Sequence, residues 1–516
     1  MIWSGKQEQG ADFDVPTVPI YVQEHVAPEA IIARLKAGAT DDRQMLLFGE
    51  TAEDQFHKAV EFYKHEDNWQ NRLILGDSLL VMNSLLEKEG MRGKVQTIYM
   101  DPPYGINFKS NWQVSTRNSD VKNTIGDFIR QPEQVKAFRD TWELGIHSYL
   151  SYLRDRLTVA CELLNVGGSC FVQINDENVH LIRNVMDEVF GVENFVSQIT
   201  FRKKLMPLGS KTQEMMADYL VWYAKDRGQL KYRQLYRAST PDPSGRWTGA
   251  QNADGTLRRL TPEERKDFSK IPDNAKLFGT VSQWAPSFSQ ANVFDFEFEG
   301  KTYKPTSGQC WITSEEKMQK LAKMGRLFVE GSFPRYVSFH EDFPYAKITN
   351  PWDDTAPAQN KTYAVQTNEQ VIARCLFMTS DPGDIVLDLT CGSGTTAYVA
   401  EQWGRRWITT DTSRVALALA RTRLMTAKYS YYKLKDESSV STGFEYETVP
   451  HLSLKSLVND EEAEQEVLYD KPLENKRIVR VAGPFTVESL SPHRISDAQD
   501  MVSTDRFVQI IIDNLL

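Results

Sequence analysis

Residues 98–108, IYMDPPYGINF, place an acid, two prolines and an aromatic ring directly after an apolar run. The apolar run predicts a buried strand that ends at Asp101. Neither Pro102 nor Pro103 has a backbone N–H, so the Asp101 carboxylate and the Pro102 carbonyl would form an edge that only accepts hydrogen bonds. Tyr104 would stack on a ring held at that edge. The four residues predict a slot for a flat ring that bears an amine; a strand followed by a plain proline turn is the alternative.

A second motif, VLDLTCGSGTT at residues 386–396, predicts a strand that ends at Asp388 and a glycine-rich turn before a helix. Gly392 and Gly394 would let the backbone approach a ligand and direct the helix N-terminus towards it. Asp411 ends a further predicted strand, near the ~20-residue offset at which an acid binds ribose hydroxyls. No Lys follows the glycines, which excludes a Walker loop, and the incomplete G-x-G-x-x-G pattern disfavours NAD. A tight turn without a ligand is the alternative.

Four acids follow predicted apolar strands, namely Asp77, Asp101, Asp388 and Asp411. In an open parallel sheet, ligands bind at the edge formed by the carboxyl ends of the strands. Four carboxylates on one edge repel one another unless a partner compensates their charge. S-adenosylmethionine carries hydroxyls, amines and a positive charge, so the pattern predicts this cofactor.

At these motifs the chain resembles the DNA amino-methyltransferases. Asp101-Pro102-Pro103-Tyr104 is similar to their D-P-P-Y motif, and DLTCGSGTT is similar to their cofactor motif. D-P-P-Y comes first here, and a variable module separates it from the glycine motif, which is the order of the circularly permuted beta class. The segments LILGDSL, LLNVGGSCFVQINDEN and FGVENFVSQITFRKK also resemble modification subunits of type III restriction systems. One position departs from the family, which usually has an aromatic residue where Thr390 stands.

The resemblance implies an α/β, Rossmann-like S-adenosylmethionine-dependent methyltransferase fold, circularly permuted, with an inserted target-recognition module. It implies that Asp77 meets the adenine of the cofactor, that Asp411 meets its ribose and that Asp388 lies near its methionine end. Lys361 belongs to a segment loosely similar to the one that covers the methionine carboxylate. The remaining cofactor-binding residues implied are those of the glycine turn: Thr390, Cys391, Gly392, Ser393, Gly394 and Thr395.

The amine of an adenine ring is a poor nucleophile because its lone pair is delocalised into the ring. Acceptance of its hydrogens by Asp101 and the Pro102 carbonyl would free that lone pair, and the base must first leave the duplex. We therefore expect a site-specific adenine-N6 DNA methyltransferase of a restriction-modification or phage-defence system. The alternatives are a cytosine-N4 methyltransferase, disfavoured by Asp rather than Ser at position 101, and a non-catalytic DNA-binding subunit of a defence complex.

Residues 202–237 carry nine Lys or Arg against three acids, with Trp222, Tyr223, Tyr232 and Tyr236 interleaved. Basic residues with aromatics suit a surface that follows phosphates, and an ordinary charged strand is the alternative. The tryptophans of the following module, Trp247, Trp284 and Trp311, are further candidates for DNA contact. The basic residues predicted to bind DNA are Arg202, Lys203, Lys204, Arg246, Arg258 and Arg259.

Five segments would position these residues. Residues 1–70 are expected to form a helical and loop extension. Residues 71–235 alternate strand and helix and then end in adjacent strands, which predicts the catalytic half of an α/β sheet with an antiparallel edge. Residues 236–345 are dense in Gly, Pro and Ser and predict the target-recognition module. Residues 346–436 return to the α/β pattern as the cofactor-binding half. Residues 437–516 are expected to be an acidic linker and the start of a further domain.

Composition bounds these predictions. The 516 residues suffice for several domains, and 41% apolar and 25% charged residues are ordinary for a globular protein. No stretch predicts a membrane span or a signal peptide, and the five scattered cysteines favour a reducing cytoplasm over a disulfide scaffold or a metal site. The net charge of −10 does not itself indicate a nucleic-acid ligand. The expected partners are double-stranded DNA, a second copy of the chain, and a restriction or helicase subunit or another defence protein.

Overall fold

The computed structural model describes residues 15–33, 59–103, 146–206, 209, 212–243, 245–355, 367–437 and 439–490. The chain divides into two compact units. The first unit comprises Met1–Arg233, Thr349–Glu445 and Leu473–Leu516, and the second comprises Gln234–Ile348 and Tyr446–Pro472. Two predicted site residues, Tyr104 and Lys361, lie outside the described residues.

A ten-stranded sheet of order β1-β24-β3-β19-β18-β4-β5-β7-β6-β17 forms the centre of the first unit. From β24 to β5 the neighbouring strands are parallel, and β7 runs antiparallel between β5 and β6. The antiparallel edge expected from the adjacent strands is therefore present. The central strands are β3 (Asn71–Leu75), β19 (Arg406–Asp411), β18 (Ile385–Asp388), β4 (Val95–Met100), β5 (Leu164–Ile174), β7 (Ala217–Ala224), β6 (Phe195–Arg202) and β17 (Pro351–Trp352).

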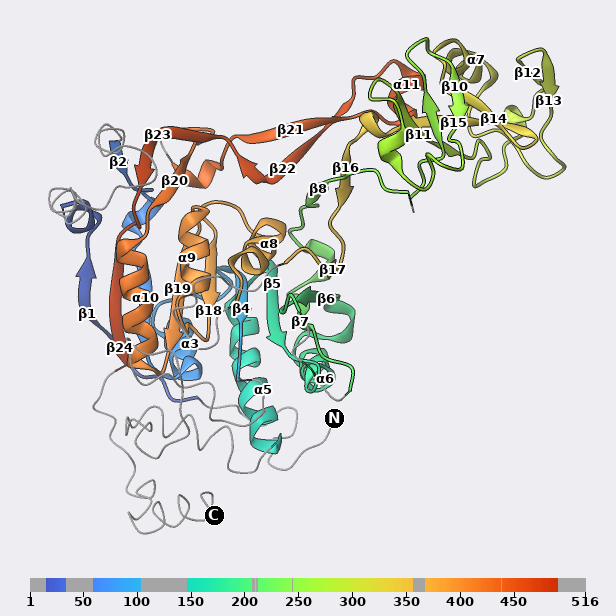
Figure 1. Ribbon diagram of the computed structural model, residues 1–516. Coiled ribbons are helices and arrows are strands. Elements are labelled where there is room, and N and C mark those ends of the chain that lie inside the picture. The colour runs from blue at the N-terminus through green and yellow to red at the C-terminus, as the bar shows by residue number, and fades with distance from the viewer. Residues whose placement is uncertain are drawn as a thin grey trace. The chain divides into compact units, whose positions relative to one another are not determined.

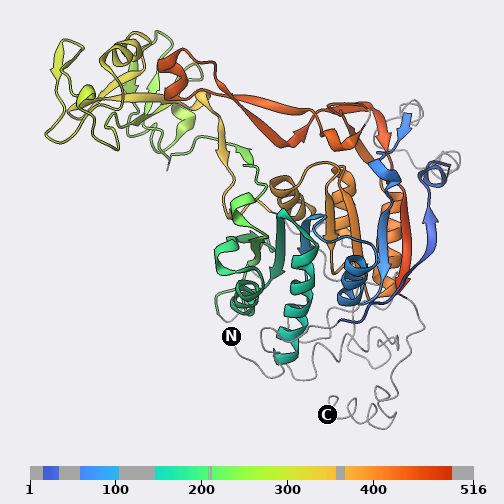
Figure 2. The ribbon, with the colours of Figure 1, turned by 180° about the vertical axis from the view of Figure 1, so that it is seen from behind.

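Helices cover both faces of this sheet (Figures 1 and 2). One layer contains α3 (Ser78–Glu87), α5 (Ile146–Leu163) and α6 (Val179–Phe190). The other layer contains α8 (Glu369–Thr379), α9 (Thr395–Gln402) and α10 (Arg414–Thr426). Because both faces are covered, all six residues of β4 are buried, and they show no alternation of buried and exposed positions. The expected Rossmann-like α/β fold is confirmed.

Both ends of the described chain add strands to this unit, which differs from the sequence-based expectation. β24 (Phe485–Leu490) pairs in parallel with β3, and β1 (Ile20–Val26) pairs antiparallel with β24. A smaller sheet joins β2 (Ala59–Glu61), β23 (Glu474–Arg480) and β20 (Tyr429–Tyr432). β1 and β2 lie in the segment expected to be a helical and loop extension, and β23 and β24 lie in the segment expected to be a linker and a further domain, whereas β20 ends the expected cofactor-binding half. Short segments with a few apolar residues form strands once a sheet edge is available to pair with.

The second unit is built on a five-stranded antiparallel sheet of order β10-β9-β11-β15-β14. Its core gathers aromatic and aliphatic residues such as Phe296, Trp311, Met318 and Leu327, together with Leu457 from the later stretch of the chain. Its strands are β8 (Tyr236–Ala238), β9 (Gly249–Gln251), β10 (Leu257–Arg259), β11 (Lys276–Val281), β12 (Phe296–Phe298), β13 (Lys301–Tyr303), β14 (Leu327–Glu330), β15 (Phe333–Phe339) and β16 (Tyr345–Lys347). Its helices are α7 (Glu315–Lys323) and α11 (Leu454–Asn459).

The acidic stretch 460–474 is not a free linker. Most of it forms β22 (Glu464–Pro472), which pairs antiparallel with β21 (Tyr446–His451) within the second unit. Leu468 of β22 is buried, Glu466 and Asp470 on either side of it are half-buried, and Glu464 is exposed, so the acidic stretch forms a paired strand with one covered position. Among the helices of the described residues, none has both the length and the apolar character needed to cross a membrane.

Candidate active site

The four strand-end acids lie along one edge of the main sheet. β3, β19, β18 and β4 are parallel neighbours, so their carboxyl ends meet at the same edge. Asp388 and Asp411 are the last residues of β18 and β19, Asp101 follows β4 directly, and Asp77 follows β3 after one glycine. The structure thus brings together acids that are widely separated in the sequence, at the place where open α/β sheets bind ligands.

The Asp-Pro-Pro segment touches the glycine-rich turn. The backbone N–H of Asp101 donates to the hydroxyl oxygen of Thr390 at 3.0 Å, and the N–H of Thr390 donates to the Asp388 carboxylate at 2.9 Å. Pro102 is buried and Pro103 is half-buried. Thr390 stands where the resembling family usually has an aromatic residue. Here its hydroxyl supplies a polar link between the two motifs that a hydrocarbon ring cannot supply.

The turn has the left-handed backbone that its glycines predict. Gly392 has φ 51° and Gly394 has φ 73°, a region that other residues avoid. The Gly392 N–H donates to the Asp411 carboxylate at 2.9 Å, and the Gly394 N–H donates to the Cys391 carbonyl at 2.8 Å. A Cβ added to Gly394 would lie 2.7 Å from the Cβ of Ala420. The turn therefore needs glycine at position 394 for both conformation and space.

Two of the strand-end carboxyls titrate close to neutrality. Burial raises the pKa of Asp411 from 3.8 to about 6, although its two oxygens accept from the N–H groups of Gly392 and Ser413. Burial, together with the nearby Asp411 charge, likewise raises the pKa of Asp388 to about 6. A cationic or hydrogen-bond-donating ligand at this edge would stabilise both carboxylates, since an opposite charge favours the ionised form.

Asp77 has a structural partner for which no role was predicted. Its carboxylate accepts from the Leu79 N–H at 2.9 Å as the N-cap of α3, and it pairs with the Arg156 guanidinium at 2.5 Å. Arg156 is 4% exposed, donates to the Ser78 hydroxyl at 3.0 Å and lies 3.6 Å from the centre of the Tyr152 ring. A lone Arg in a helical pattern ordinarily indicates a surface residue, so the sequence carried no signal for this buried ion pair.

Thr367 contacts Asp101 and is linked in turn to polar residues of β5 and β4. The Thr367 hydroxyl lies 3.2 Å from Asp101 Oδ2, and Gln173 Nε2 donates to Thr367 Oγ1 at 2.9 Å. The Tyr99 hydroxyl donates to Gln173 Oε1 at 2.5 Å. Asn175, just after β5, is 6% exposed, and its side-chain oxygen has no hydrogen-bond partner among the described residues. The only signal for Gln173 in the sequence is a polar residue inside the apolar run FVQI.

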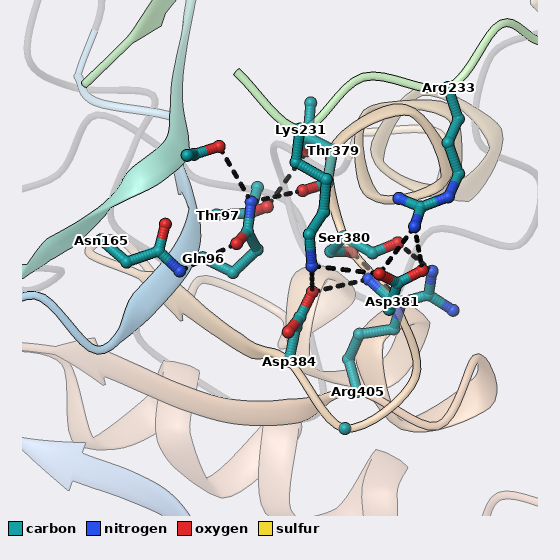
Figure 3. A network of polar contacts seen from close by, with 12 residues as sticks. Gln96, Thr97, Asn165, Lys231, Arg233, Thr379, Ser380, Asp381, Asp384 and Arg405 are labelled. Carbon is teal, nitrogen blue, oxygen red and sulfur yellow. Dashed lines mark hydrogen bonds and ion pairs between the residues drawn. The ribbon is translucent and has the colours of Figure 1, made fainter. Parts of the chain in front are cut away.

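A polar network at the strand starts anchors α8, the helix that begins just after Thr367 (Figure 3). Gln96 Nε2 donates to the Thr379 carbonyl at 2.7 Å, and the Thr97 and Thr379 hydroxyls lie 3.0 Å apart. The Arg405 guanidinium donates to the Ser380 carbonyl at 2.7 Å. These contacts fix the last turn of α8 against β4. The first turn of α8, and with it Thr367, is therefore held relative to the strand that ends at Asp101.

The three basic residues at the end of β6 bind groups of their own unit. Lys203 pairs with Asp218 at 2.5 Å, and Lys204 pairs with Glu214 at 2.8 Å. The Arg202 guanidinium donates to the carbonyl oxygens of Lys204 at 2.9 Å and Leu205 at 2.7 Å. Because β6 is aligned with β5, its carboxyl end lies at the same sheet edge as the strand-end acids. These basic residues stand at the correct edge, but each already has partners.

The basic residues of the second unit are also paired. The Arg258 guanidinium donates to both oxygens of Glu264, at 2.7 and 2.8 Å, and this lowers the pKa of Glu264 to about 2. Arg259 pairs with Glu330 at 3.1 Å. A paired Arg must give up its carboxylate partner to bind a DNA phosphate. This loss reduces the net free energy that the Arg contributes to DNA binding.

The aromatic residues expected on a DNA-binding surface are mostly core residues. Trp222 and Tyr223 are buried in β7, and Trp222 stacks on Phe171 with ring centres 5.1 Å apart. Tyr232 is 48% exposed. In the second unit, Trp311 is fully buried and stacks on Trp284; Trp247 is also buried and lies beneath Arg246, whose guanidinium is 4.6 Å from the ring centre. Trp222, Tyr223, Tyr236, Trp247 and Trp311 are buried, so their rings fill the interior, and DNA contact by Trp247 or Trp311 would require these rings to become exposed.

Near its end, the basic stretch 202–237 takes part in a half-buried ion-pair cluster. Lys231 contacts both Asp381 at 3.0 Å and Asp384 at 2.7 Å, and Arg233 pairs with Asp381 at 2.5 Å (Figure 3). The two acids precede β18, so these pairs tie the outgoing chain to the start of the central strand. All five cysteines are free, and within the described ranges no group of three or more His, Cys, Asp or Glu is placed to hold a metal ion.

A parallel α/β sheet with a glycine-rich turn after a central strand defines a protein that binds a nucleotide-like ligand. The Asp-Pro-Pro edge beside that turn adds a site for an amine on a second molecule. Residues 95–422 match the family of DNA methylases named N6_N4_Mtase, and the chain belongs to this family. The resemblance drawn from the D-P-P-Y and glycine motifs is confirmed.

Named relatives agree with the family. The chain is 26% identical over 355 residues to type II methyltransferase M.EcaI of Enterobacter cloacae, covering 67% of each chain. It is 25% identical over 398 residues to the probable type III restriction-modification enzyme HindVI Mod subunit of Haemophilus influenzae, covering 67% of this chain but 49% of that protein. Among solved structures, the putative DNA modification methylase TTHA0409 of Thermus thermophilus, complexed with S-adenosyl-L-methionine, is 16% identical with a TM-score of 0.32, covering 68% of this chain and 92% of that one.

Proposed function

We propose that this chain is a site-specific DNA methyltransferase that uses S-adenosylmethionine to methylate the N6 amine of an adenine flipped out of duplex DNA. The observation that supports the proposal is the hydrogen bond from the Asp101 N–H to Thr390, because it joins the segment proposed to accept the amine to the glycine turn proposed to bind the cofactor. Membership of the DNA methylase family supports the same function.

The residues of the glycine turn fit the cofactor. The backbone at Gly394 occupies a conformation and a space that exclude a side chain. When bound, S-adenosylmethionine supplies a methyl group on a positively charged sulfur. In this proposal Asp411 binds the ribose hydroxyls, Asp77 lies near the cofactor adenine and Asp388 lies near the methionine end, with Lys361 above it. The turn residues that complete the cofactor site are Thr390, Cys391, Gly392, Ser393 and Thr395.

The Asp-Pro-Pro edge fits the target amine. Asp101 and the Pro102 carbonyl would accept the two amine hydrogens; the Pro103 ring restricts the backbone, and Pro103 offers no competing N–H. These acceptors would draw the amine nitrogen towards tetrahedral geometry. Transfer would form the N–C bond as the methyl–sulfur bond of the bound cofactor breaks, and the surplus amine proton would pass by way of Asp101 to water. Tyr104 stacks on the flipped base. An acid at position 101 favours adenine; methylation of cytosine N4 is the second candidate, supported by the N6_N4 scope of the family.

Double-stranded DNA is the proposed substrate, and the second unit is the proposed target-recognition module. Arg202, Lys203 and Lys204 stand at the catalytic edge of the sheet, and the second unit contributes Arg246, Arg258 and Arg259. We propose a cytoplasmic role in restriction-modification or phage defence. The matched HindVI protein is named as a Mod subunit, so a restriction subunit is the proposed partner. A second copy of the chain is a further proposed partner.

The test is transfer of tritiated methyl from S-adenosylmethionine to unmethylated bacteriophage DNA, which presents many sequences, followed by identification of the modified base. The parent should yield N6-methyladenine. Asp101→Ala should bind cofactor and DNA normally but lower transfer more than ~100-fold, which corresponds to about 2.7 kcal/mol in the barrier. N4-methylcytosine as the product would establish the second candidate. A well-folded parent that binds DNA but transfers nothing would establish the non-catalytic alternative.

A further inference from the structure

A chain of three hydrogen-bonding side chains, the buried Tyr99 and Gln173 and the half-buried Thr367, ends on the Asp101 carboxylate. The Tyr99 hydroxyl donates to Gln173 Oε1 at 2.5 Å, Gln173 Nε2 donates to Thr367 Oγ1 at 2.9 Å, and Thr367 Oγ1 lies 3.2 Å from Asp101 Oδ2. Tyr99 is 1% exposed and Gln173 is 3% exposed. The Tyr99–Gln173 contact therefore forms in an interior of low dielectric, where hydrogen bonds strengthen one another, and the two contacts of Thr367 are partly buried.

The proton of Thr367 has two acceptors within reach, Asp101 Oδ2 and Gln173 Oε1, both at 3.2 Å. Gln173 Oε1 already accepts the Tyr99 hydroxyl at the shorter distance of 2.5 Å. A carboxylate is also the stronger acceptor, because bonds to an ionised group are roughly twice as strong as neutral ones. The proton of Thr367 therefore points to Asp101, and the chain of donors runs in one direction from Tyr99 to the carboxylate.

The elements that carry the chain are rigid. Tyr99 lies on β4 two residues before Asp101, and Gln173 lies on the neighbouring parallel strand β5. Thr367 immediately precedes Asn368, the N-cap of α8, whose side chain accepts from the Gln370 N–H at 2.7 Å. The far end of α8 is anchored by the Gln96 and Thr97 contacts to Thr379 (Figure 3). α8 is thus fixed at both of its ends, and Thr367, which lies just before its first residue, is held with it.

We infer that Tyr99, Gln173 and Thr367 form a positioning relay that sets the plane of the Asp101 carboxylate and holds it in the ionised form. The inference rests on the proposed function, in which Asp101 accepts from the target amine. A donor to the carboxylate favours the ionised state over the protonated one. Tyr149 of α5 also lies within reach of the Asp101 charge, but burial raises the pKa of its hydroxyl well above the usual range, so it stays neutral across the pH range of the test. The relay therefore keeps the Asp101 carboxylate ionised, and able to accept the amine hydrogen, at a lower pH than an unassisted carboxylate would permit.

The experiment compares Thr367→Val, which removes the hydroxyl at constant shape, with Thr367→Ser, which retains it. Single-turnover methyl transfer to bacteriophage DNA is measured across pH, together with cofactor and DNA affinity. Thr367→Val should lower the rate about 10- to 100-fold and move the acid limb of the pH–rate profile to higher pH, with both affinities near the parent values. Thr367→Ser should restore the rate and the profile. Tyr99→Phe should move the profile in the same direction by a smaller amount.

Thr486→Val is the matched control, because the Thr486 hydroxyl also donates to a carboxylate, that of Glu488, on β24 and apart from the relay and the contacts that anchor α8. It should lower stability without moving the acid limb. A Thr367→Val protein with the parent rate and profile would overturn the relay, as would an equal shift in Thr486→Val. A parent that transfers no methyl group at all would remove the proposed function, and the relay with it.

Discussion

The backbone N–H of Asp101 and the hydroxyl of Thr390, 289 positions apart in the chain, meet at 3.0 Å. They meet because β4 and β18 are hydrogen-bonded parallel neighbours, with Leu387 paired to Ile98 and Asp388 paired to Tyr99. The order in which the two motifs occur along the sequence is therefore immaterial to the site. The sheet alone determines that the end of β4 and the turn after β18 share an edge.

Thr390→Val should weaken the connection between the two motifs. Valine preserves the shape but leaves the Asp101 N–H without this acceptor, and an unpaired, partly buried amide costs about 1–3 kcal/mol. We expect a lower melting temperature and slower methyl transfer, with cofactor affinity less affected than the rate. Thr390→Ser keeps the acceptor and should restore both properties. An unchanged transfer rate in Thr390→Val would show that the contact does not position Asp101.

Gly394→Ala should disrupt the glycine turn. Both the left-handed backbone, which costs roughly 1–2 kcal/mol, and the contact with Ala420 oppose a side chain there. Gly90→Ala is the matched control, because Gly90 also has a positive φ of 61° but a Cβ there would meet nothing within 4 Å. Thermal unfolding should show a larger loss in Gly394→Ala, and calorimetry should show weaker S-adenosylmethionine binding in that variant alone. Equal losses of stability in the two variants would show that the contact with Ala420 does not add to the cost of a side chain at position 394.

Cofactor binding should depend on pH near neutrality. The pKa of Asp388 and that of Asp411 are each raised by burial to about 6, so both groups are largely protonated below that pH. A cationic ligand prefers the ionised forms. Affinity should rise through about pH 6, by up to about tenfold per pH unit for each proton lost, and then level off. Calorimetry in two buffers of different ionisation enthalpy measures the protons released on binding.

Without ligand, the same two groups should have the opposite effect on stability. Because each folded-state pKa lies above the ordinary value of 3.8, the folded chain binds more protons than the unfolded chain between about pH 4 and about pH 6. Stability should therefore fall as pH rises through this window. Asp388→Asn keeps an acceptor for the Thr390 N–H and should reduce the fall. If the stability of Asp388→Asn falls with pH as steeply as that of the parent, Asp388 is not one of the groups that cause the fall.

Exchange of the second unit should change the methylated sequence while the chemistry continues. A hybrid that takes residues 234–348 and 446–472 together from a relative keeps the unit whole, including the packing of Leu457 in its core. A hybrid that takes only residues 234–348 should be less stable, because Leu457 and β21 would meet a foreign surface. Sequencing with detection of modified bases gives the recognised site. A stable full hybrid that still marks the original site would place recognition outside this unit.

The sheet and the strand-end acids were predictable because they depend on local pattern. Apolar runs that end in an acid, such as the one before Asp101, predict buried parallel strands, and parallel strands necessarily share an edge. The turn at Gly392 and Gly394 was predictable for the same reason, since glycine is the residue that readily adopts the left-handed backbone of such a turn.

The remaining features depend on contacts between distant segments, which a single sequence does not encode locally. The sequence alone predicts Arg156 to be a surface residue, and only the packing of α3 against α5 shows that it is buried. Likewise, Gln173 looks like an interruption of a strand in the sequence, and only the fold shows that Thr367 lies beside it. Trp311 reads as a candidate DNA contact although it is the centre of a core. The acidic residues of β22 read as a linker because their pairing strand, β21, has no strong pattern either.

β24 lies between β1 and β3, and Arg72 of β3 binds Glu488 of β24 across 416 positions of sequence. During synthesis on the ribosome, β3 emerges early, but its two parallel neighbours, β19 and β24, come from the late part of the chain. Such a high contact order predicts slow folding, and a strand that waits with both edges open is prone to pair wrongly. Nascent chains of this protein should therefore depend on chaperones until β24 has left the exit tunnel.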